Sequence, residues 1–302
     1  MVGEQGGGGG SADPLTVGVA DRLTADATDR LTADATDRLT ADATDRLTAD
    51  VRVAYESAAA GWADGPERVY APLADTLVAS ATVPLTGSRV LDLGAGTGAA
   101  GLAARASGAC QVVAVDLAAG MLRRCPAPLH PLAADAAALP FRDDSFDLVV
   151  AAFCLSHLGS IGAGLAEARR VGRAIAASAF APGWTHPAKA AVDDALRPFG
   201  YRPPAWHVAL KSQGEPQAGD PALLAQRAAA AGFRDVQVRT IVVATGLSTA
   251  AQLASWRLGM ANIAAFVRSL DAPRRAAARY AAERAVVGCE PLVVPMVVLT
   301  GG

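Results

Sequence analysis

The feature that most constrains this fold is an apolar run that ends in a glycine-rich loop. Residues 90–93 read Val-Leu-Asp-Leu, residues 94–98 read Gly-Ala-Gly-Thr-Gly, and an alanine-rich stretch follows. Glycine permits a tight turn and lets a ligand approach the backbone closely. The pattern therefore predicts a strand, a ligand-binding turn and a helix in direct succession.

The rest of the chain alternates between apolar runs and helical patterns. Strands are expected at residues 88–93, 111–116, 129–134, 146–153, 173–180, 236–245 and 291–299. Helices are expected at residues 52–62, 66–80, 98–106, 118–124, 162–170, 187–197 and 221–231, and through 248–287. This alternation predicts an α/β fold whose seven-stranded, mostly parallel sheet carries helices on both faces. The last two strands suggest an antiparallel C-terminal edge, and the helices between them suggest a cap.

The first 50 residues differ from the remainder in composition. Five glycines occupy residues 6–10, and an octad, Asp-Arg-Leu-Thr-Ala-Asp-Ala-Thr, repeats from residue 21. An eight-residue unit turns its leucines around a helix and leaves no apolar stripe. We expect residues 1–50 to form a mobile or partly helical tail without a catalytic role. Residues 51–302 would form one domain, with a cofactor half at 51–180 and an acceptor or cap half at 181–302.

Composition narrows the class of partner. The net charge of −2 gives no basic footprint for nucleic acid and no polybasic patch for a membrane. The four cysteines are scattered without a C-x-x-C pair, so no metal site is expected. No secretory leader and no 18-residue apolar run is seen, which favours a cytoplasmic protein with a small-molecule partner. Nothing in the pattern specifies the oligomeric state.

Two kinds of nucleotide ligand fit the glycine loop. Residues 96–101 match G-x-G-x-x-G and Asp116 follows Gly96 by 20 residues, as in NAD(P)-dependent oxidoreductases. Asp92, however, precedes the first glycine, where a carboxylate repels a pyrophosphate and attracts an amino group. Asp135 follows the third strand, where its carboxylate could accept from an adenine amino group while the Ala136 N–H donates to the ring. These two carboxylates favour the other kind of nucleotide ligand, an adenosine compound that carries an amino group.

Three ordered segments resemble the class I S-adenosylmethionine-dependent methyltransferases of the small-molecule, type 11-like family. They are residues 92–98, residues 115–122 (Val-Asp-Leu-Ala-Ala-Gly-Met-Leu) and residues 135–147, with Leu-Pro-Phe at 139–141. The resemblance covers residues 50–180 well and the remainder poorly. It implies a Rossmann-like fold and in-line transfer of a methyl group from S-adenosylmethionine to a small, apolar metabolite. A non-catalytic chain that keeps this fold as a binding module is a further alternative.

The resemblance also implies which residues hold the cofactor. The glycines would pass beneath its methionine part, the first aspartate would anchor its amino group, and the second would hold its ribose. The other residues would pack on adenine, read its edge, or close over the methionine chain. The implied set is Tyr55, Asp92, Gly94, Gly96, Gly98, Asp116, Leu117, Met121, Asp135, Ala136 and Phe153.

The acceptor side rests on scarce aromatic residues and on histidines near strand ends. Five of the 15 aromatic residues fall within residues 180–206, where they could line an acceptor pocket or pack an insertion onto the sheet. The candidate pocket residues are Trp184, Tyr201, Trp206, Trp256 and Met260. His157 and His186 follow the fourth and fifth strands and are candidates for a base or an acceptor-orienting group. Alternatively, His157 caps a turn or touches the cofactor, and His186 begins a helix at Pro187.

Overall fold

The computed structural model describes residues 45–302. Residues 47–302 form one compact unit. The predicted tail lies outside the described residues up to position 44. Residues 45–50 are helical and continue without a break to residue 62, so the predicted boundary at residue 51 falls inside a helix.

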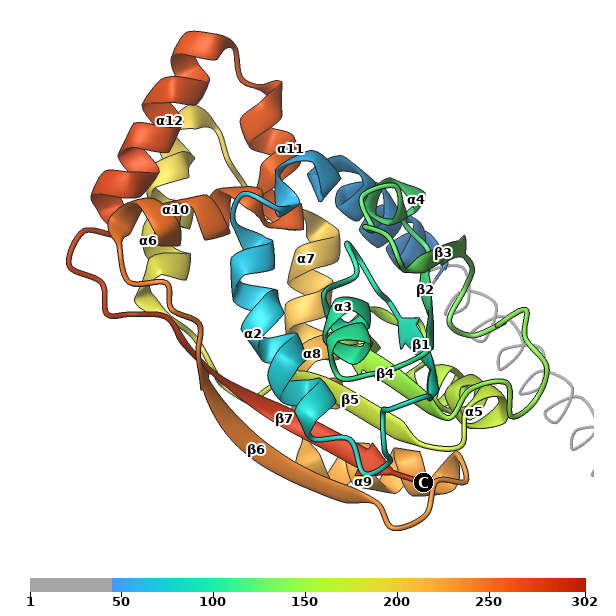
Figure 1. Ribbon diagram of the computed structural model, residues 1–302. Coiled ribbons are helices and arrows are strands. Elements are labelled where there is room, and N and C mark those ends of the chain that lie inside the picture. Colours follow the sequence, from blue (N-terminus) through green and yellow to red (C-terminus); the bar gives the residue numbers. More distant parts are fainter. Residues whose placement is uncertain (1–44) are drawn as a thin grey trace, which may run out of the picture. The chain divides into compact units, whose positions relative to one another are not determined.

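The sheet has seven strands in the order β3-β2-β1-β4-β5-β7-β6 (Figure 1). The strands are β1 (Arg89–Leu93), β2 (Gln111–Asp116), β3 (His130–Ala133), β4 (Leu148–Ala152), β5 (Ile175–Phe180), β6 (Gln237–Ala244) and β7 (Val293–Gly301). The first five are parallel, and β7 runs antiparallel to both β5 and β6. The predicted mostly parallel sheet with an antiparallel C-terminal edge is confirmed.

The strand order places a ligand crevice at the end of β1. The chain passes from β1 to β2 on one side and later returns to β4 on the other side. Leu91 pairs with Val113 of β2 and with Val149 of β4, so β1 is enclosed by both neighbours. In such sheets ligands bind outside the carboxyl ends of the strands, at the point where the order reverses. The glycine loop begins at this point.

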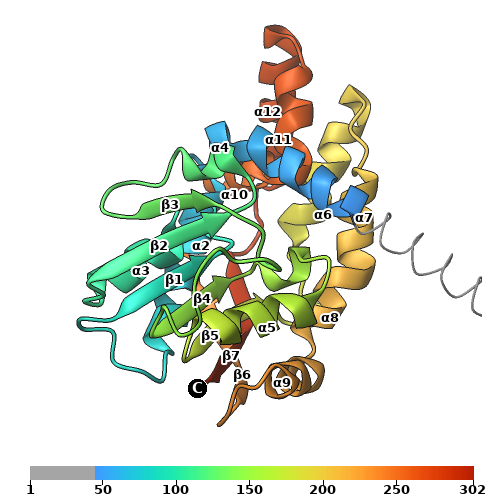
Figure 2. The ribbon, with the colours of Figure 1, turned by 90° about the vertical axis from the view of Figure 1, so that its right-hand side faces the viewer.

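Helices cover both faces of the sheet. On one face α2 (Pro66–Ala79) packs beside α3 (Ala99–Ala106), and on the other α5 (Ile161–Val171) and α8 (Glu215–Gly219) pack against α9 (Pro221–Ala230) (Figures 1 and 2). The central strands β1, β4, β5 and β7 are largely buried, as expected where helices cover both faces of a sheet, whereas β3 and most of β6 are exposed. Val90 and Val150 enter one core, whereas Leu91, Val149 and Ile175 enter the other.

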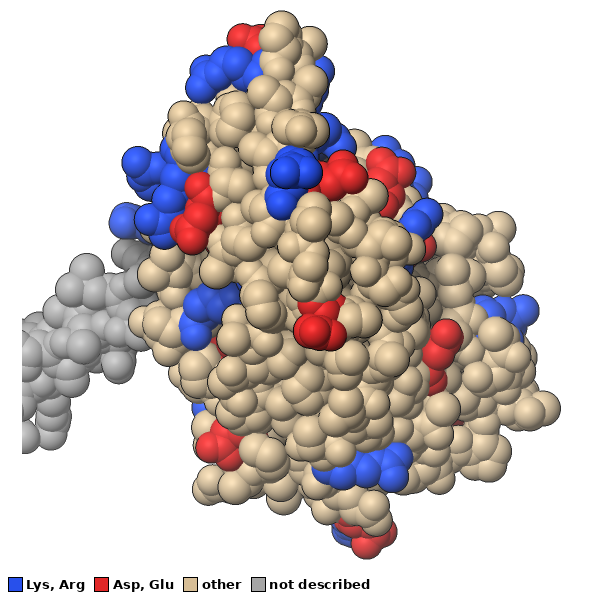
Figure 3. Space-filling model, turned by 90° about the vertical axis from the view of Figure 1, so that its left-hand side faces the viewer, with Lys and Arg blue, Asp and Glu red and all other residues tan. Residues whose placement is uncertain are grey.

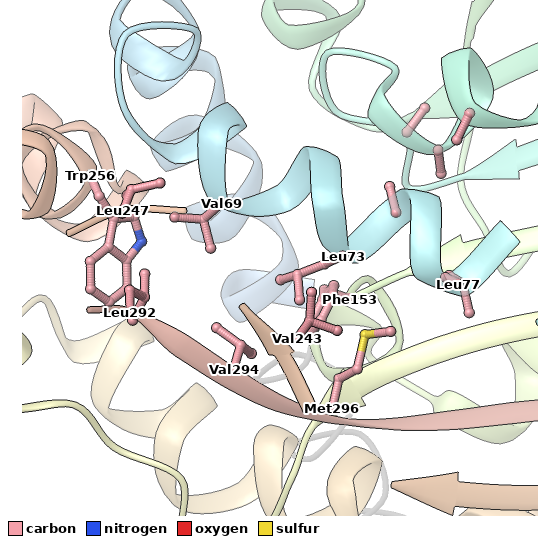
Figure 4. Close-up of a cluster of buried hydrophobic side chains, with 14 of the residues drawn as sticks. Val69, Leu73, Leu77, Phe153, Val243, Leu247, Trp256, Leu292, Val294 and Met296 are labelled. Carbon is pink, nitrogen blue, oxygen red and sulfur yellow. The ribbon is translucent and has the colours of Figure 1, made fainter. Parts of the chain in front are cut away.

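A helical layer joins the second half of the chain to the sheet. It contains α6 (Pro187–Leu196), α10 (Ala250–Gly259), α11 (Ala261–Ser269) and α12 (Ala272–Ala285). The expected helical stretch at 248–287 is divided where Met260 and Leu270 adopt extended backbone. Trp256 of α10 lies in an apolar cluster with Val69 and Leu292 (Figure 4), which anchors this layer on α2 and on the loop before β7.

Two short helices between α6 and α9 were not expected from the sequence. They are α7 (Ala205–Ala209) and α8, joined by a π-helical turn at Leu210–Gly214. This region contains prolines and glycines, which are typical of loops, so its sequence pattern did not predict helices. The remaining elements are α4 (Ala119–Leu122) and the 3₁₀ turns Leu155–His157 and Arg197–Phe199.

The face seen in Figure 3 carries dispersed charges of both signs between large uncharged areas. Within residues 45–302 no helix has the length and apolarity needed to cross a bilayer. The same residues contain no group of three or more His, Cys, Asp or Glu side chains arranged to hold a metal ion.

Candidate active site

The glycine loop between β1 and α3 is shaped by three left-handed residues. Gly94, Gly96 and Gly98 have φ of 68°, 57° and 93°, a region that other residues enter at a cost. A Cβ atom at Gly94 would overlap Cys154, and one at Gly98 would overlap a side chain packed beneath α3. A Cβ atom at Gly96 would meet only the Met121 Cε atom, at 3.7 Å. The space over Gly96 is therefore open to a ligand.

Asp116 ends β2 beside this loop. Its Oδ2 atom accepts a hydrogen bond from the Gly96 N–H at 2.8 Å, and its Oδ1 atom accepts one from the Ala118 N–H at 2.8 Å. Burial raises the pKa of this carboxyl, and the backbone donors oppose that rise. Each carboxylate oxygen keeps a further lone pair. The side chain can therefore accept from two neighbouring hydroxyl groups, as a ribose would present them.

Asp92 lies in β1 just before the loop and is almost fully buried. Its Oδ2 atom accepts a hydrogen bond from the Gly101 N–H at 2.7 Å. Burial raises the pKa of Asp92 to about 7, although the Gly101 donor lowers it. A buried carboxylate is stabilised by a cation. The site therefore fits a ligand that brings an ammonium group.

The predicted adenine side lies beyond the ends of β2 and β3. Asp116 pairs with Ala133 in the sheet, so the loop that carries Asp135 leaves the sheet next to it. The exposed Asp135 accepts a hydrogen bond from the Ala137 N–H at 2.8 Å, which fixes the turn that contains Ala136. Leu117 is 38% exposed, an open apolar surface for a ring. Met121 is buried beneath the loop.

Phe153 marks the end of β4 with an unusual backbone. It has φ of 56°, a conformation that costs about 1–3 kcal/mol for a residue with a side chain. Its ring lies 5.5 Å from that of Tyr70 and 4.6 Å from that of Phe180, measured between centroids. Strained residues of this kind cluster at ligand sites. Phe153 thus connects the loop edge of the sheet to an aromatic cavity.

The cavity has a volume of about 130 Å³ and is lined from both halves of the domain. The predicted site residues that line it are Tyr55, His157, Trp184, Trp206, Trp256 and Met260. It is also lined by Phe180, one of the aromatic residues within 180–206, and by Val69, Tyr70, Lys189, Asp193, His207, Leu210, Lys211, Glu215, Arg257, Ala261 and Asn262. Elements far apart in sequence therefore meet in one apolar space that includes several charges.

Tyr55 and His157 close one side of the cavity. The Tyr55 hydroxyl and the His157 Nε2 atom are 2.9 Å apart, and the Ser156 Oγ atom lies 3.1 Å from His157 Nδ1. Burial lowers the pKa of His157 to about 4 and raises the pKa of Tyr55 well above its usual value. Near pH 7 the imidazole is neutral and the phenol is protonated. The pair ties the N-terminal helix to the end of β4.

Two of the residues predicted for the acceptor side, His186 and Tyr201, lie outside the cavity lining. His186 is the N-cap of α6: its Nδ1 atom accepts from the Ala188 N–H, and its Nε2 atom lies 3.2 Å from the Glu290 carbonyl oxygen. Tyr201 is buried, and its hydroxyl accepts a hydrogen bond from the Asn262 side chain at 2.9 Å. The structure thus gives His186 the helix-capping role named as its alternative, and Tyr201 a role in packing.

The charged residues of the cavity were not predicted, because the sequence signals for the acceptor side were histidines and scarce aromatic residues. Lys189 is the clearest case, since Lys189 and Lys211 are the only lysines in a chain with 27 lysine and arginine residues. Both line this cavity. Scarcity, which drew attention to the aromatic residues, could have drawn attention to the lysines as well.

Comparisons with known proteins agree with this geometry. A family model described as a methyltransferase domain matches residues 91–175. The chain is 45% identical over 97 residues to a demethylmenaquinone methyltransferase of Clavibacter sepedonicus, covering 30% of this chain and 39% of that protein. It is 37% identical over 131 residues to a malonyl-[acyl-carrier protein] O-methyltransferase of Geobacter sulfurreducens, covering 40% of this chain and 48% of that protein. The matches span less than half of either relative.

A solved structure extends the likeness of fold beyond the matched segment. It is described as a methyltransferase from an antibiotic-biosynthesis pathway of Anabaena variabilis, with 16% identity and a TM-score of 0.54. The alignment covers 78% of this chain and 99% of that chain. Residues 91–175, which contain the glycine loop and both of its carboxylates, thus match a methyltransferase domain, and the solved structure extends the likeness to the fold.

Proposed function

We propose that this protein transfers a methyl group from S-adenosylmethionine to a small, largely apolar metabolite. The observation that carries the proposal is the open backbone at Gly96, held by the Asp116 carboxylate at 2.8 Å. An aromatic cavity lies at the same edge of the sheet, linked to the loop side by Phe153. Bound S-adenosylmethionine supplies a methyl group that its sulfonium already activates for displacement.

The residues of the loop would hold the cofactor by complementary charge and shape. The open space over Gly96 would admit the methionine part of the cofactor, and the free lone pairs of the Asp116 carboxylate would accept hydrogen bonds from the two ribose hydroxyl groups. Asp92, whose burial disfavours its own charge, gains stability from an ammonium group. Leu117 offers an exposed apolar surface to adenine. This donor and acceptor set fits an amino-acid-bearing nucleoside better than a pyrophosphate.

The cavity would position the acceptor and exclude water from it. Its volume of about 130 Å³ is close to the roughly 150 Å³ cavity that binds benzene in an engineered protein. An in-line displacement depends mainly on positioning and desolvation, so these walls can supply much of the catalysis. His157, neutral and hydrogen-bonded to Tyr55, would orient an acceptor hydroxyl or amine through the Tyr55 hydroxyl or by exchanging that hydrogen bond.

The relatives support methyl transfer and leave the acceptor open. One is named for demethylmenaquinone and the other for malonyl-[acyl-carrier protein], and each matches less than half of its own length. The family model ends at residue 175, before Trp184, Lys189 and Arg257. The shared segment therefore supports the cofactor half, while the acceptor must be inferred from the cavity itself.

Calorimetric titration of the full chain with S-adenosylhomocysteine, NAD and NADP tests the cofactor. We expect micromolar binding of S-adenosylhomocysteine alone. Asp116→Asn, which keeps the side-chain volume, should weaken that binding by about tenfold or more through lost charge-assisted hydrogen bonds. Asp75→Asn on the exposed side of α2 is the matched control and should change nothing.

A second experiment tests turnover. Transfer of label from methyl-labelled S-adenosylmethionine to an acceptor, followed across a panel of small aromatic metabolites, should show a product that requires an intact Asp116. Preferential binding of NAD or NADP would overturn the methyltransferase proposal in favour of an oxidoreductase. Cofactor binding without turnover of any acceptor would favour a non-catalytic binding module.

A further inference from the structure

We infer that the acceptor is a small aromatic or similarly compact molecule bearing one anionic oxygen group, held in the cavity by the Lys189 ammonium. The inference rests on the proposed function, since it names the acceptor class of the same site. It begins from the charges that line the cavity. Three are cations, Lys189, Lys211 and Arg257, and two are anions, Asp193 and Glu215.

Four of these five charges are already paired. The Lys211 Nζ atom lies 2.5 and 2.7 Å from the two carboxylate oxygens of Glu215. An Arg257 terminal nitrogen lies 3.0 Å from an Asp193 oxygen. Among residues 45–302 no carboxylate lies within ion-pair distance of Lys189. The cavity therefore has one positive charge in excess, and it belongs to Lys189.

The position of the Lys189 ammonium is fixed by aromatic rings. Its Nζ atom lies 3.6 Å from the centroid of the Trp184 ring and 5.5 Å from that of Phe180. Trp184 is itself held, because its indole N–H donates to the Val293 carbonyl at 3.2 Å. Cation–π contact stabilises an ammonium without neutralising it. The charge remains available to an anion that enters beside these rings.

A second donor of the same cavity lacks a partner. The Nε atom of Arg257 is buried and has no hydrogen-bond partner in the described part of the chain. Buried donors are nearly always satisfied, so an exception at a cavity-lining residue indicates a missing acceptor atom. An anionic oxygen group offers several lone pairs. It could satisfy the Arg257 donor as well as the Lys189 charge.

The choice of amino acid supports a ligand role for this lysine. Elsewhere the chain uses arginine for its cations, and both of its lysines line one cavity. Burial, reinforced by Lys211 and Arg257, lowers the pKa of Lys189 to about 7, while Glu215 and Asp193 oppose that shift. Burial disfavours the charged form of Lys189, and an anion that binds beside the ammonium stabilises that charged form by forming an ion pair with it.

Two probe molecules of similar shape that differ by one negative charge test the inference. The 302-residue chain, saturated with S-adenosylhomocysteine, is titrated at pH 6.5 with 4-fluorobenzoate and with 4-fluorobenzamide, and binding is followed by fluorine NMR. The two probes share a ring that suits the cavity and differ in charge. We expect the benzoate to bind about tenfold or more tightly than the amide.

Variants assign any preference to Lys189. Lys189→Met should remove the preference for the benzoate, change amide binding far less than benzoate binding, and leave S-adenosylhomocysteine affinity unchanged. Lys189→Arg should retain most of the preference. Arg197→Met, which removes an exposed cation at the end of the same helix, should retain all of it. Thermal unfolding of each variant checks that the fold is intact.

The outcomes separate the two proposals. Equal binding of the two probes, absence of benzoate binding, or a preference that survives in Lys189→Met would overturn the anionic acceptor. Failure of S-adenosylhomocysteine to bind would overturn the proposed function instead. In that case the same probe titrations, run on the protein alone, still show whether the cavity selects an anion.

Discussion

Replacing Asp92 by asparagine should stabilise the fold above neutral pH while weakening cofactor binding. Asp92 is buried and its pKa is raised from 3.8 to about 7. Each pKa unit corresponds to about 1.4 kcal/mol, so the shift corresponds to about 4 kcal/mol. The folded state binds the proton more tightly than the unfolded state does. This stability is therefore fully present below pH 3.8 and is lost as the pH rises to 7.

The asparagine variant has no proton to lose at this position. Its free energy of unfolding, minus that of the wild type, should rise by about 3 kcal/mol between pH 5 and pH 8. The buried amide adds a cost of its own, about 1–3 kcal/mol, if its N–H₂ group finds no acceptor. That cost is nearly independent of pH, so the slope of the difference isolates the carboxylate.

Urea unfolding followed by circular dichroism at several pH values measures this difference. Asp75→Asn, the same change at an exposed carboxylate of α2, is the control against which the slope for Asp92→Asn is compared. A difference for Asp92→Asn that stays constant within about 0.5 kcal/mol would refute the argument that burial raises the pKa of Asp92.

The same variant should bind S-adenosylhomocysteine more weakly, although its fold is more stable at pH 8. The folded protein is less stable when Asp92 is ionised without a partner, and it regains that stability when an ammonium group is bound near the carboxylate. Sites of this kind trade stability for function. Unchanged affinity in Asp92→Asn would show that the ligand amino group is held elsewhere.

Three further predictions test the loop, the cavity and the helical layer. Gly94→Ala should destabilise the protein by about 3 kcal/mol or more, since its Cβ atom would overlap Cys154 at a residue with left-handed backbone. Gly96→Ala should destabilise it by only about 1–2 kcal/mol and yet abolish S-adenosylhomocysteine binding. Urea unfolding measures the loss of stability, and calorimetry measures the loss of binding. Affinity for 4-fluorobenzoate should fall as the pH rises above about 7, because Lys189 then loses its proton in the empty cavity, and a flat fluorine-NMR titration from pH 6 to 9 would contradict this. Thr249→Ala should cost about 1 kcal/mol in urea unfolding by removing the capping box of α10, and no loss would mean that packing alone fixes this helix.

The glycine loop and the strands beside it could be predicted because their signals are local. Val90 to Gly98 specify a strand and a turn through their own conformational preferences, and Asp116 follows from the strand that ends there. The parallel order then brings both to one edge of the sheet. Each step uses residues adjacent in sequence, so no knowledge of long-range packing is required.

The acceptor half could be predicted only in part because its cavity depends on packing between distant segments. Tyr201 and Trp206 have similar sequence surroundings, yet one is buried beside α11 and the other lines the cavity. His186 follows β5 as His157 follows β4, but the helix that starts at Pro187 takes one of its ring nitrogens as a cap. Which side of a short helix faces the cavity is decided by tertiary contacts.

The division between the two halves bears on how such a protein acquires its acceptor. The proposed cofactor contacts would come from backbone donors and two carboxylates whose places are fixed by the sheet. Several of the cavity residues come from α6, α10 and α11, where one substitution such as Lys189→Met changes the charge of the cavity and leaves the sheet untouched. Acceptor choice can therefore change without loss of the cofactor site, which explains why segments matching residues of the cofactor half occur in relatives named for unlike acceptors.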